Sequence, residues 1–366
     1  MNAPVTILMV GTGGYGSVYL NELLDETKEN GVKLVGAVDP YVDKSPCAER
    51  LRERRIPVYD TLEEFYAHHT AEMAIISTPT YLHAAQTKTC MENGSDVLCE
   101  KPICSCPEDA AIMLEAQKRT GRRLAIGFQW SFNESILALK KDILAGKYGK
   151  IKRMRTITYF PRDMVYYRRG GGWAGRRKMP GGAWLLDSVV GNATAHYLHN
   201  MLFLCGKDIS DAAKPSSFTA EVYRINPIEM FDTCALRLNV GEGTELMYYA
   251  THAVPMNAYR PVEMIIEGEK GEVNLWNENG FHLVGRTCDG EVIAYGDPEH
   301  NYFNKIYRMR DAIRENAPLP CVGETALPHM ESSTYLSPFK MPLIIHQIIT
   351  YYLFIIYYYT IISKYF

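Results

Sequence analysis

Over the first 127 residues, short apolar runs alternate with segments whose apolar positions recur every three to four residues. The runs predict strands, and the recurring positions predict helices, three of which are closely followed by a glycine. The expected strands are residues 5–10, 33–38, 73–77, 97–99 and 124–128, and the expected helices are residues 17–29, 62–68, 83–92 and 109–120. Ser105 and Glu108 have the spacing of a capping box before the last helix. Strands alternating with helices predict a doubly wound parallel sheet, in an α/β domain of residues 1–127.

The pattern changes from residue 128 onward. One helix is expected at residues 135–145, and another ends at about residue 204. The expected strands are longer and alternate apolar with polar side chains, which is typical of an antiparallel sheet. They cover residues 151–159, 217–223, 234–239, 245–251, 262–268, 272–276 and 281–285. We therefore expect residues 128–330 to form an α+β domain with an open, mostly antiparallel sheet. This domain would bind substrate and join copies of the chain into a dimer or tetramer.

Residues 331–366 differ in composition from everything before them. From Met341 to Ile362 there is no Asp, Glu, Lys or Arg, and isoleucine and tyrosine dominate. Three interpretations are open: a change of reading frame near residue 330, a packed terminal helix or strand, and a membrane anchor. Pro342, His346 and Gln347 argue against a membrane span, although the stretch is long enough for one. We expect residues 331–366 to lie outside the native fold, and their removal to leave cofactor binding unchanged.

The overall charge gives no reason to expect nucleic acid or an anionic membrane as a partner. The net charge is -3, with 47% hydrophobic and 22% charged residues, as in an ordinary globular protein. The nine cysteines are scattered without a C-x-x-C pair, which predicts reduced thiols, no metal site and a cytoplasmic protein. The N-terminus enters the first strand within a few residues, so we expect no signal peptide and no membrane attachment there.

A glycine-rich turn, GTGGYG at residues 11–16, follows the first strand and opens the first helix. In that context the pattern G-x-G-x-x-G predicts a dinucleotide site. Gly11 permits the tight turn, Gly13 lets the backbone approach the pyrophosphate, and Gly16 lets the helix pack closely on the strand. The helix N-terminus offers N–H groups and positive potential to the phosphates. Gly14 and Tyr15 complete the expected site.

Asp39 ends the second strand, about 20 residues after the glycine turn, where a carboxylate can accept hydrogen bonds from the adenosine ribose. A 2′-phosphate would lie against this negative charge, so the sequence favours NAD over NADP as the cofactor. Lys44 could compensate a 2′-phosphate, which leaves the use of both dinucleotides open. The alternative is that Asp39 only caps a turn with Pro40.

Further motifs lie at the ends of later strands: STPTYLHA at residues 77–84, EKP at 100–102 and GFQ at 127–129. Gly181-Gly182, Asp187 and the H-x-x-H pair at 196–199 follow. With these motifs the chain resembles the glucose–fructose oxidoreductase and inositol dehydrogenase family over residues 5 to about 329. The resemblance implies a Rossmann domain and hydride transfer between nicotinamide and a carbinol or ketone of a sugar, inositol or related polyol. It adds as cofactor contacts Ser77, Thr78, Pro79, His83, Glu100, Lys101 and Gln129.

The same resemblance makes Lys101 the general acid/base on the substrate oxygen, with a cis bond before Pro102. A free lysine titrates near 10.4, so burial and the cationic nicotinamide would have to lower its pKa to roughly 7–8. Asp187 and His196 are the expected catalytic partners that orient the substrate hydroxyl. The family spacing Asp-x-x-x-His is lengthened here by an inserted turn, so either His196 reaches the site or Asn192 takes its place.

The segment before Asp187 is rich in glycine, arginine and aromatic residues. Aromatic rings stack on sugar faces, and arginine binds carboxylates or phosphates bidentately. The expected substrate contacts are Lys101, Tyr167, Trp173, Arg176, Asp187, Asn192 and His196. A solvated surface loop explains the aromatic and arginine residues nearly as well.

Three functions are compatible with these residues. The first is an NAD-dependent dehydrogenase that acts on CH–OH groups of a sugar or polyol. The second is a glycosidase or lyase that keeps its NAD and oxidises the substrate only transiently. The third is a non-catalytic regulator that binds a dinucleotide and a sugar. The presence of Lys101 and Asp187 favours an enzyme, although the fold alone does not establish chemistry.

Overall fold

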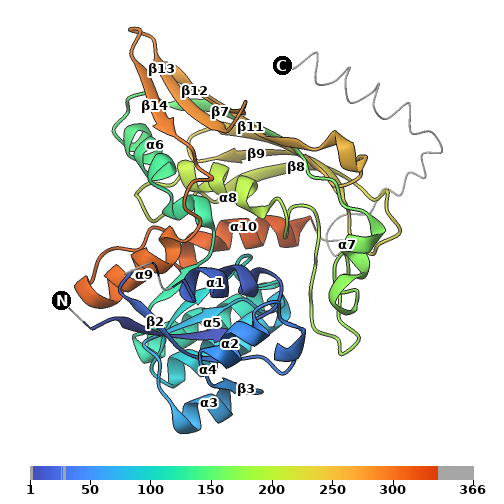
Figure 1. Ribbon diagram of the computed structural model, residues 1–366. Helices are drawn as coiled ribbons and strands as arrows, with labels where there is room; N and C mark the ends of the chain where they lie inside the picture. Colours follow the sequence, from blue (N-terminus) through green and yellow to red (C-terminus); the bar gives the residue numbers. More distant parts are fainter. Residues whose placement is uncertain (1–2, 26, 28–29, 337–366) are drawn as a thin grey trace.

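The protein contains two sheets, each with its own hydrophobic core (Figure 1). The computed structural model describes residues 3–25, 27 and 30–336. The first sheet is fully parallel, with strand order β3-β2-β1-β4-β5-β6. The second sheet has eight strands in the order β14-β13-β12-β11-β7-β10-β9-β8, and only β7 and β10 pair in parallel. The predicted fold class, a doubly wound domain followed by a mostly antiparallel α+β domain, is confirmed.

Strands of the parallel sheet are apolar on both faces because helices cover both sides of it. The strands are β1 (Val5–Val10), β2 (Val32–Val38), β3 (Val58–Tyr59), β4 (Met73–Ile76), β5 (Asp96–Cys99) and β6 (Leu124–Ile126). The helices between them are α1 (Tyr15–Leu23), α2 (Ala48–Glu53), α3 (Leu62–His68), α4 (His83–Glu92) and α5 (Pro107–Thr120). The carboxyl ends of β1, β4 and β5 therefore lie side by side, which brings the sequence motifs together.

The second sheet packs one face on helices and exposes the other (Figure 1). Its helices are α6 (Glu134–Leu144), α7 (Met164–Arg168) and α8 (Ala195–Leu204), and its strands are β7 (Ile151–Tyr159), β8 (Pro215–Tyr223), β9 (Thr233–Val240), β10 (Thr244–Thr251), β11 (Arg260–Gly268), β12 (Gly271–Asn277), β13 (Phe281–Thr287) and β14 (Val292–Gly296). Cross-strand ion pairs such as Arg153–Glu245 and Arg155–Glu267 join its strands.

The last two helices, α9 (Asn304–Glu315) and α10 (Gly323–Tyr335), return to the first domain. Ile306, Met309 and Ala326 are buried in the core of the parallel sheet. The sequence had assigned residues 128–330 to the second domain, but this packing shows that both domains share the end of that range. Helix α10 also continues past residue 330, and Leu336 is buried in the second core. Residues 331–336 thus belong to the fold, contrary to the expectation, and residues 337–366 lie outside the described residues.

Two local predictions about helix ends were wrong. Helix α5 begins at Pro107 after Cys106, which makes no side-chain capping bond. The hydroxyl of Ser105 donates instead to the carbonyl of Leu185 in the second domain, at 2.9 Å, so the expected capping box is absent there. Helix α1 ends at Leu23 rather than at residue 29. At Ser105 a tertiary contact overrides the local pattern. Helix α1 ends before the apolar pattern that predicted it.

An ion pair connects α9 to Glu72, the residue directly before β4 in the first domain. Arg314 donates to both oxygens of Glu72, at 2.6 and 2.8 Å, and the backbone N–H of Thr6 adds a third bond at 3.0 Å. The Arg314 hydrogen bonds lower the pKa of Glu72 from 4.5 to about 2, against the opposing effect of burial. The contribution of this carboxylate to stability is therefore fully present above pH 4.5 and is lost as the pH falls toward 2.

Replacing Glu72 by glutamine should make the unfolding free energy of the protein depend less on pH in acid. At pH 7, Glu72→Gln should lower the unfolding free energy by about 1 kcal/mol, a value discounted for solvent screening at this partly exposed pair. As the pH falls from 4.5 to 3, the difference between variant and wild type should shrink, and thermal melts across that range measure it. Glu53→Gln, at an exposed position, is the control. A difference that stays constant with pH would contradict the assignment.

Candidate active site

The glycine turn has the shape that a dinucleotide requires. Gly11 has a φ of +86°, and a Cβ there would meet the carbonyl oxygen of Ser77 at 2.8 Å. A Cβ on Gly16 would collide with the carbonyl of Gly11, so this glycine lets α1 pack on β1. Around Gly13 and Gly14, in contrast, the space is open. The first turn of α1 carries no acidic side chain that would repel an anion, so its positive potential suits a pyrophosphate beside Gly13 and Gly14.

Asp39 lies beside this turn, at the end of β2. One of its carboxylate oxygens accepts from both the backbone N–H and the hydroxyl of Thr12, each at 2.7 Å. The other oxygen accepts from the backbone N–H of Tyr41 at 2.8 Å. The ammonium of Lys44 lies over the Tyr41 ring, 5.2 Å from its centroid. The carboxylate is thus held against the glycine turn at the end of β2, and Lys44 contacts an aromatic ring.

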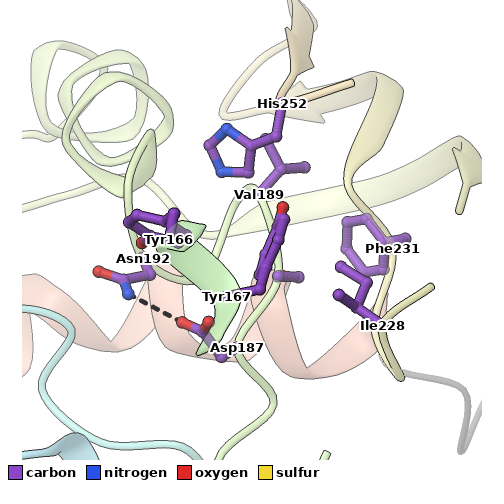
Figure 2. A pocket seen from close by; sticks show the side chains of 9 residues that line it. Tyr166, Tyr167, Asp187, Val189, Asn192, Ile228, Phe231 and His252 are labelled. Carbon is purple, nitrogen blue, oxygen red and sulfur yellow. Dashed lines mark hydrogen bonds between the residues drawn. The ribbon is translucent and has the colours of Figure 1, made fainter. Parts of the chain in front are cut away.

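Lys101 projects from the end of β5 toward the second domain. The peptide bond before Pro102 is cis, as the family resemblance implied. The Lys101 Nζ donates to the backbone carbonyl of Asn192 at 3.0 Å and to its side-chain Oδ1 at 3.2 Å. Asn192 in turn donates from Nδ2 to Asp187 at 2.8 Å, as Figure 2 shows. Three predicted site residues therefore form one chain of hydrogen bonds across the domain boundary.

Burial shifts the pKa values at both ends of this chain. It lowers the pKa of Lys101, although the charge of Glu100 opposes the shift. It raises the pKa of Asp187, against the hydrogen bonds from Gly175 and Asn192. The residue before Asp187, Leu186, is held at a φ of +49° with its side chain in the second core. Such a backbone conformation costs about 1–3 kcal/mol and is typical of functional sites.

The two histidines of the H-x-x-H pair have different surroundings. His199 is buried, stacks on Phe128 with ring centroids 3.8 Å apart, and hydrogen-bonds Ser131 at 3.0 Å. Its packing role is therefore structural. The Nδ1 atoms of both histidines are buried without a hydrogen-bond partner, and burial lowers the pKa of both imidazoles well below the usual value; at His196 the charge of Lys101 adds to this effect. Asn192, from the inserted turn, makes the direct contact with Lys101.

His83 lies between two loops of the first domain. It is 1% exposed, and its Nδ1 atom is 3.1 Å from the carbonyl of Pro102. Its Nε2 atom is 3.0 Å from the carbonyl of Thr78. The hydroxyl of Thr78 donates to Gln86. His83 thus connects the EKP loop to the STP turn through its two ring nitrogens. Its ring is buried between them and is not exposed for contact with a cofactor.

Two further predicted residues belong to a network between the domains. Tyr15 donates to Gln129 at 3.3 Å, and Gln129 donates to Glu299 at 3.4 Å. The indole of Trp130 donates to the same carboxylate at 2.8 Å. Glu299, which the sequence did not single out, therefore helps to hold Gln129 beside the glycine turn.

The most important residue that the sequence reasoning missed is Lys305 on α9. It is fully buried and forms an ion pair with Glu100. Glu100 also accepts from the Tyr19 hydroxyl at 2.6 Å and from the backbone N–H of Lys101 at 3.1 Å. Burial alone would raise the pKa of Glu100, but Lys305 and Lys101 outweigh it and lower the pKa. The available signal in the sequence was a lysine next to Ile306, in the apolar stripe of a helix that was not predicted.

A small cavity lies behind Asp187, between the second sheet and α7 (Figure 2). Its volume is about 10 Å³, room for about one water molecule. Its lining consists of Tyr166, Tyr167, Asp187, Ser188, Val189, Asn192, Ile228, Phe231 and His252. The Tyr167 hydroxyl is buried there without a hydrogen-bond partner. Tyr167 therefore faces this enclosed space, too small for a sugar.

The other two expected substrate contacts lie in the loop after α7. Arg176 donates from its Nε to the carbonyl of Gly172, so part of its guanidinium supports its own loop. Trp173 lies beneath the guanidinium of Arg169 at 5.2 Å. Among the described residues there is no group of three or more potential metal ligands and no disulfide. Within the same part of the chain, every helix is too short or too polar to cross a membrane.

Comparisons with known proteins agree with this geometry. A family model described as an oxidoreductase family with an NAD-binding Rossmann fold matches residues 5–128. The scyllo-inositol 2-dehydrogenase (NADP(+)) of Bacillus subtilis is 24% identical over 353 residues, which cover 88% of this chain and 91% of that protein. The 1-carboxy-3-chloro-3,4-dihydroxycyclo hexa-1,5-diene dehydrogenase of Comamonas testosteroni is 27% identical over 165 residues, 44% of this chain and 40% of that protein.

Several relatives match over only 36–44% of their own length. Among solved structures, the WlbA dehydrogenase from Bordetella pertussis, in complex with NADH and UDP-GlcNAcA, has a TM-score of 0.72 to this chain. It is 21% identical, and the match covers 93% of this chain and 99% of that chain. This likeness extends the shared fold over both domains.

Replacing Lys305 by methionine should destabilise the protein strongly because Glu100 would stay buried without its counter-charge. We expect Lys305→Met to lower the unfolding free energy by about 3–5 kcal/mol, measured by urea denaturation. Lys140 is the matched control, because it is equally buried but bonds the backbone carbonyl of Asp211. Lys140→Met should cost about 1–3 kcal/mol. Equal losses in both variants would contradict a special role for the Glu100–Lys305 pair.

Proposed function

Because the chain belongs to the glucose–fructose oxidoreductase and inositol dehydrogenase family, we propose that it is an NAD-dependent dehydrogenase acting on a CH–OH group of a sugar, inositol or related polyol. The observation that carries this proposal is the chain of hydrogen bonds from Lys101 through Asn192 to Asp187, at the strand end beside the glycine turn. It supplies a partly buried amine next to the expected nicotinamide position.

Lys101 acts in this proposal as the base that takes the proton from the substrate hydroxyl. A neutral amine has two N–H donors and one lone pair. Both donors can be occupied by the two oxygens of Asn192, which leaves the lone pair directed away from that residue. Asp187 holds the Asn192 amide in place. The chain thereby orients an amine whose burial favours the neutral form needed for proton acceptance.

The cofactor, when bound, supplies the acceptor for the hydride that leaves the carbinol carbon. Gly13 and Gly14 would receive its pyrophosphate, and Asp39 its adenosine ribose. His196, whose pKa is lowered by burial and by the charge of Lys101, is the second polar group proposed for the substrate hydroxyl. A neutral imidazole there can donate or accept one hydrogen bond without adding charge.

The cofactor preference depends on Asp39. A 2′-phosphate would meet this carboxylate, so NAD should bind at least tenfold more tightly than NADP, a difference of about 1.4 kcal/mol. Asp39→Ser should narrow the ratio, mainly by removing repulsion of the 2′-phosphate. Binding of both dinucleotides to wild type and variant, followed by nucleotide fluorescence, measures the ratio. Equal affinities of the wild-type protein for NAD and NADP would overturn the preference.

Removal of the Lys101 amine should abolish most catalysis while sparing cofactor binding. We expect Lys101→Met to lower kcat by roughly 10²–10⁴ with nearly unchanged dinucleotide affinity. Lys101→Arg should not rescue it, because a guanidinium stays protonated. In the oxidative direction, log kcat/KM should rise with pH and level off above the lowered lysine pKa, and this bend should be absent from the variant. Lys118→Met, at an exposed position, is the control.

The comparison of Asn192→Ala with His196→Ala shows which residue holds the second polar role. A larger loss of kcat in Asn192→Ala would agree with its direct contact to Lys101. Net release of NADH during turnover distinguishes a dehydrogenase from an enzyme that retains its NAD. A Lys101→Met protein with near-normal turnover would overturn the mechanism, and a wild-type protein without turnover on any polyol would favour the regulator.

A further inference from the structure

One segment of this acidic chain is strongly basic. The chain as a whole has a net charge of -3, but residues 160–184 carry six basic side chains and a single carboxylate. The basic residues are Arg162, Arg168, Arg169, Arg176, Arg177 and Lys178, and the carboxylate is Asp163. The segment includes α7 and descends from the end of β7 alongside the first domain (Figure 1). It therefore places a local excess of positive charge next to the candidate active site.

Two of these arginines are stacked between aromatic rings. The guanidinium of Arg162 lies 4.3 Å from the centroid of Phe160 and 4.1 Å from that of Tyr166. The guanidinium of Arg169 lies 3.6 Å from the centroid of Tyr166 and 5.2 Å from that of Trp173. We call Phe160, Arg162, Tyr166, Arg169 and Trp173 the arginine ladder. Stacking holds the guanidinium faces and leaves N–H groups at their edges to bind an anion.

Neither Arg162 nor Arg169 forms an ion pair with a carboxylate among the residues that the structure describes. Other arginines of the chain do, as in Arg153–Glu245 and Arg314–Glu72. The Nε atom of Arg162 is buried and has no hydrogen-bond partner. A buried donor without an acceptor costs about 1–3 kcal/mol, more when it is charged. The arginine ladder therefore has hydrogen-bond donors for which a bound ligand could supply the acceptor.

The ladder is connected to the Lys101 chain of hydrogen bonds. Tyr166 lines the same cavity as Asp187 and Asn192 (Figure 2). Burial is the main cause that lowers the pKa of Lys101, and the positive charge of Arg162 acts in the same direction. Burial raises the pKa of Asp187, and the positive charge of Arg169 opposes this rise. A ligand that contacts Lys101 with one group can thus present another group to the arginines.

We propose that the arginine ladder binds an anionic substituent, a carboxylate or a phosphate, on the polyol that Lys101 oxidises. Arginine recognises both groups through paired N–H donors. The substrate class is accordingly acidic sugars rather than neutral ones. The oxidation of an acidic sugar rests on the proposed function. The binding of an anion is argued from the arginine ladder alone.

The test measures initial rates of NADH formation by the full chain with matched probes. D-glucuronate and D-galacturonate supply the carboxylate, D-glucose 6-phosphate supplies the phosphate, and D-glucose, D-galactose and myo-inositol are neutral. The best anionic probe should exceed its neutral counterpart by a hundredfold or more in kcat/KM. Whether the two uronates or the sugar phosphate perform better identifies the anion. Equal values for anionic and neutral probes would overturn the proposal.

Variants of the ladder separate recognition from chemistry. Arg162→Gln and Arg169→Gln should each lower kcat/KM for the best anionic probe tenfold to a hundredfold, mainly through KM. Arg169→Gln should change kcat/KM for the neutral counterpart less than about twofold. Arg168→Gln, next in sequence and exposed, is the matched control and should keep full activity. Arg169 is exposed as well, so its variant serves if Arg162→Gln fails to fold. Equal losses for anionic and neutral probes would assign the ladder a structural role.

Binding of D-glucuronate and D-glucose 6-phosphate to the NAD-loaded protein, measured by calorimetry, distinguishes the two proposals. Binding that is lost in Arg169→Gln, without turnover, would support the ladder and overturn the dehydrogenase function. Turnover of neutral probes only, with no anion binding, would overturn the ladder and leave the dehydrogenase function standing. Absence of both binding and turnover of every anion would overturn the ladder.

Discussion

The buried ion pair between Glu100 and Lys305 is the contact around which the candidate site is organised. Charge in an interior is tolerated only when it is paired and hydrogen-bonded, and here one carboxylate receives donors from three parts of the chain. Tyr19 reaches it from the helix after the glycine turn, Lys101 through its backbone N–H, and Lys305 from α9. The relative position of the glycine turn and the Lys101 amine therefore depends on Lys305, which lies on a helix far along the chain.

Elements that are determined by local patterning were predicted well from the sequence. Helices α3 and α4 and strand β7 have the predicted bounds, because their apolar periodicity matches the burial that the structure shows. The glycine turn and Asp39 are equally local, since strand, turn and helix follow one another directly. The family motifs then identified Lys101, Asp187 and Asn192, which the fold brings together.

What the sequence did not reveal depends on contacts between distant segments. Lys305 and Glu100 are 205 positions apart, and Glu299 meets Gln129 across 170 positions. No periodicity encodes such pairs. The Ser105–Leu185 bond and the packing of α9 and α10 on the first core failed to be predicted for the same reason. His196 and His199 look alike in the sequence. In the structure Phe128 contacts both rings, but only His199 stacks face to face on it and hydrogen-bonds Ser131.

The return of α9 and α10 to the first domain has a consequence for biosynthesis. Met309, Ala326 and Met330 complete the core of the parallel sheet, although they are translated some 200 residues after its last strand, β6. Domains usually fold in order as they leave the ribosome. Here the nucleotide-binding domain emerges first but lacks part of its interior until the second domain has been synthesised. The nascent chain must therefore carry an incomplete, apolar surface through most of translation, which is a situation suited to chaperone binding.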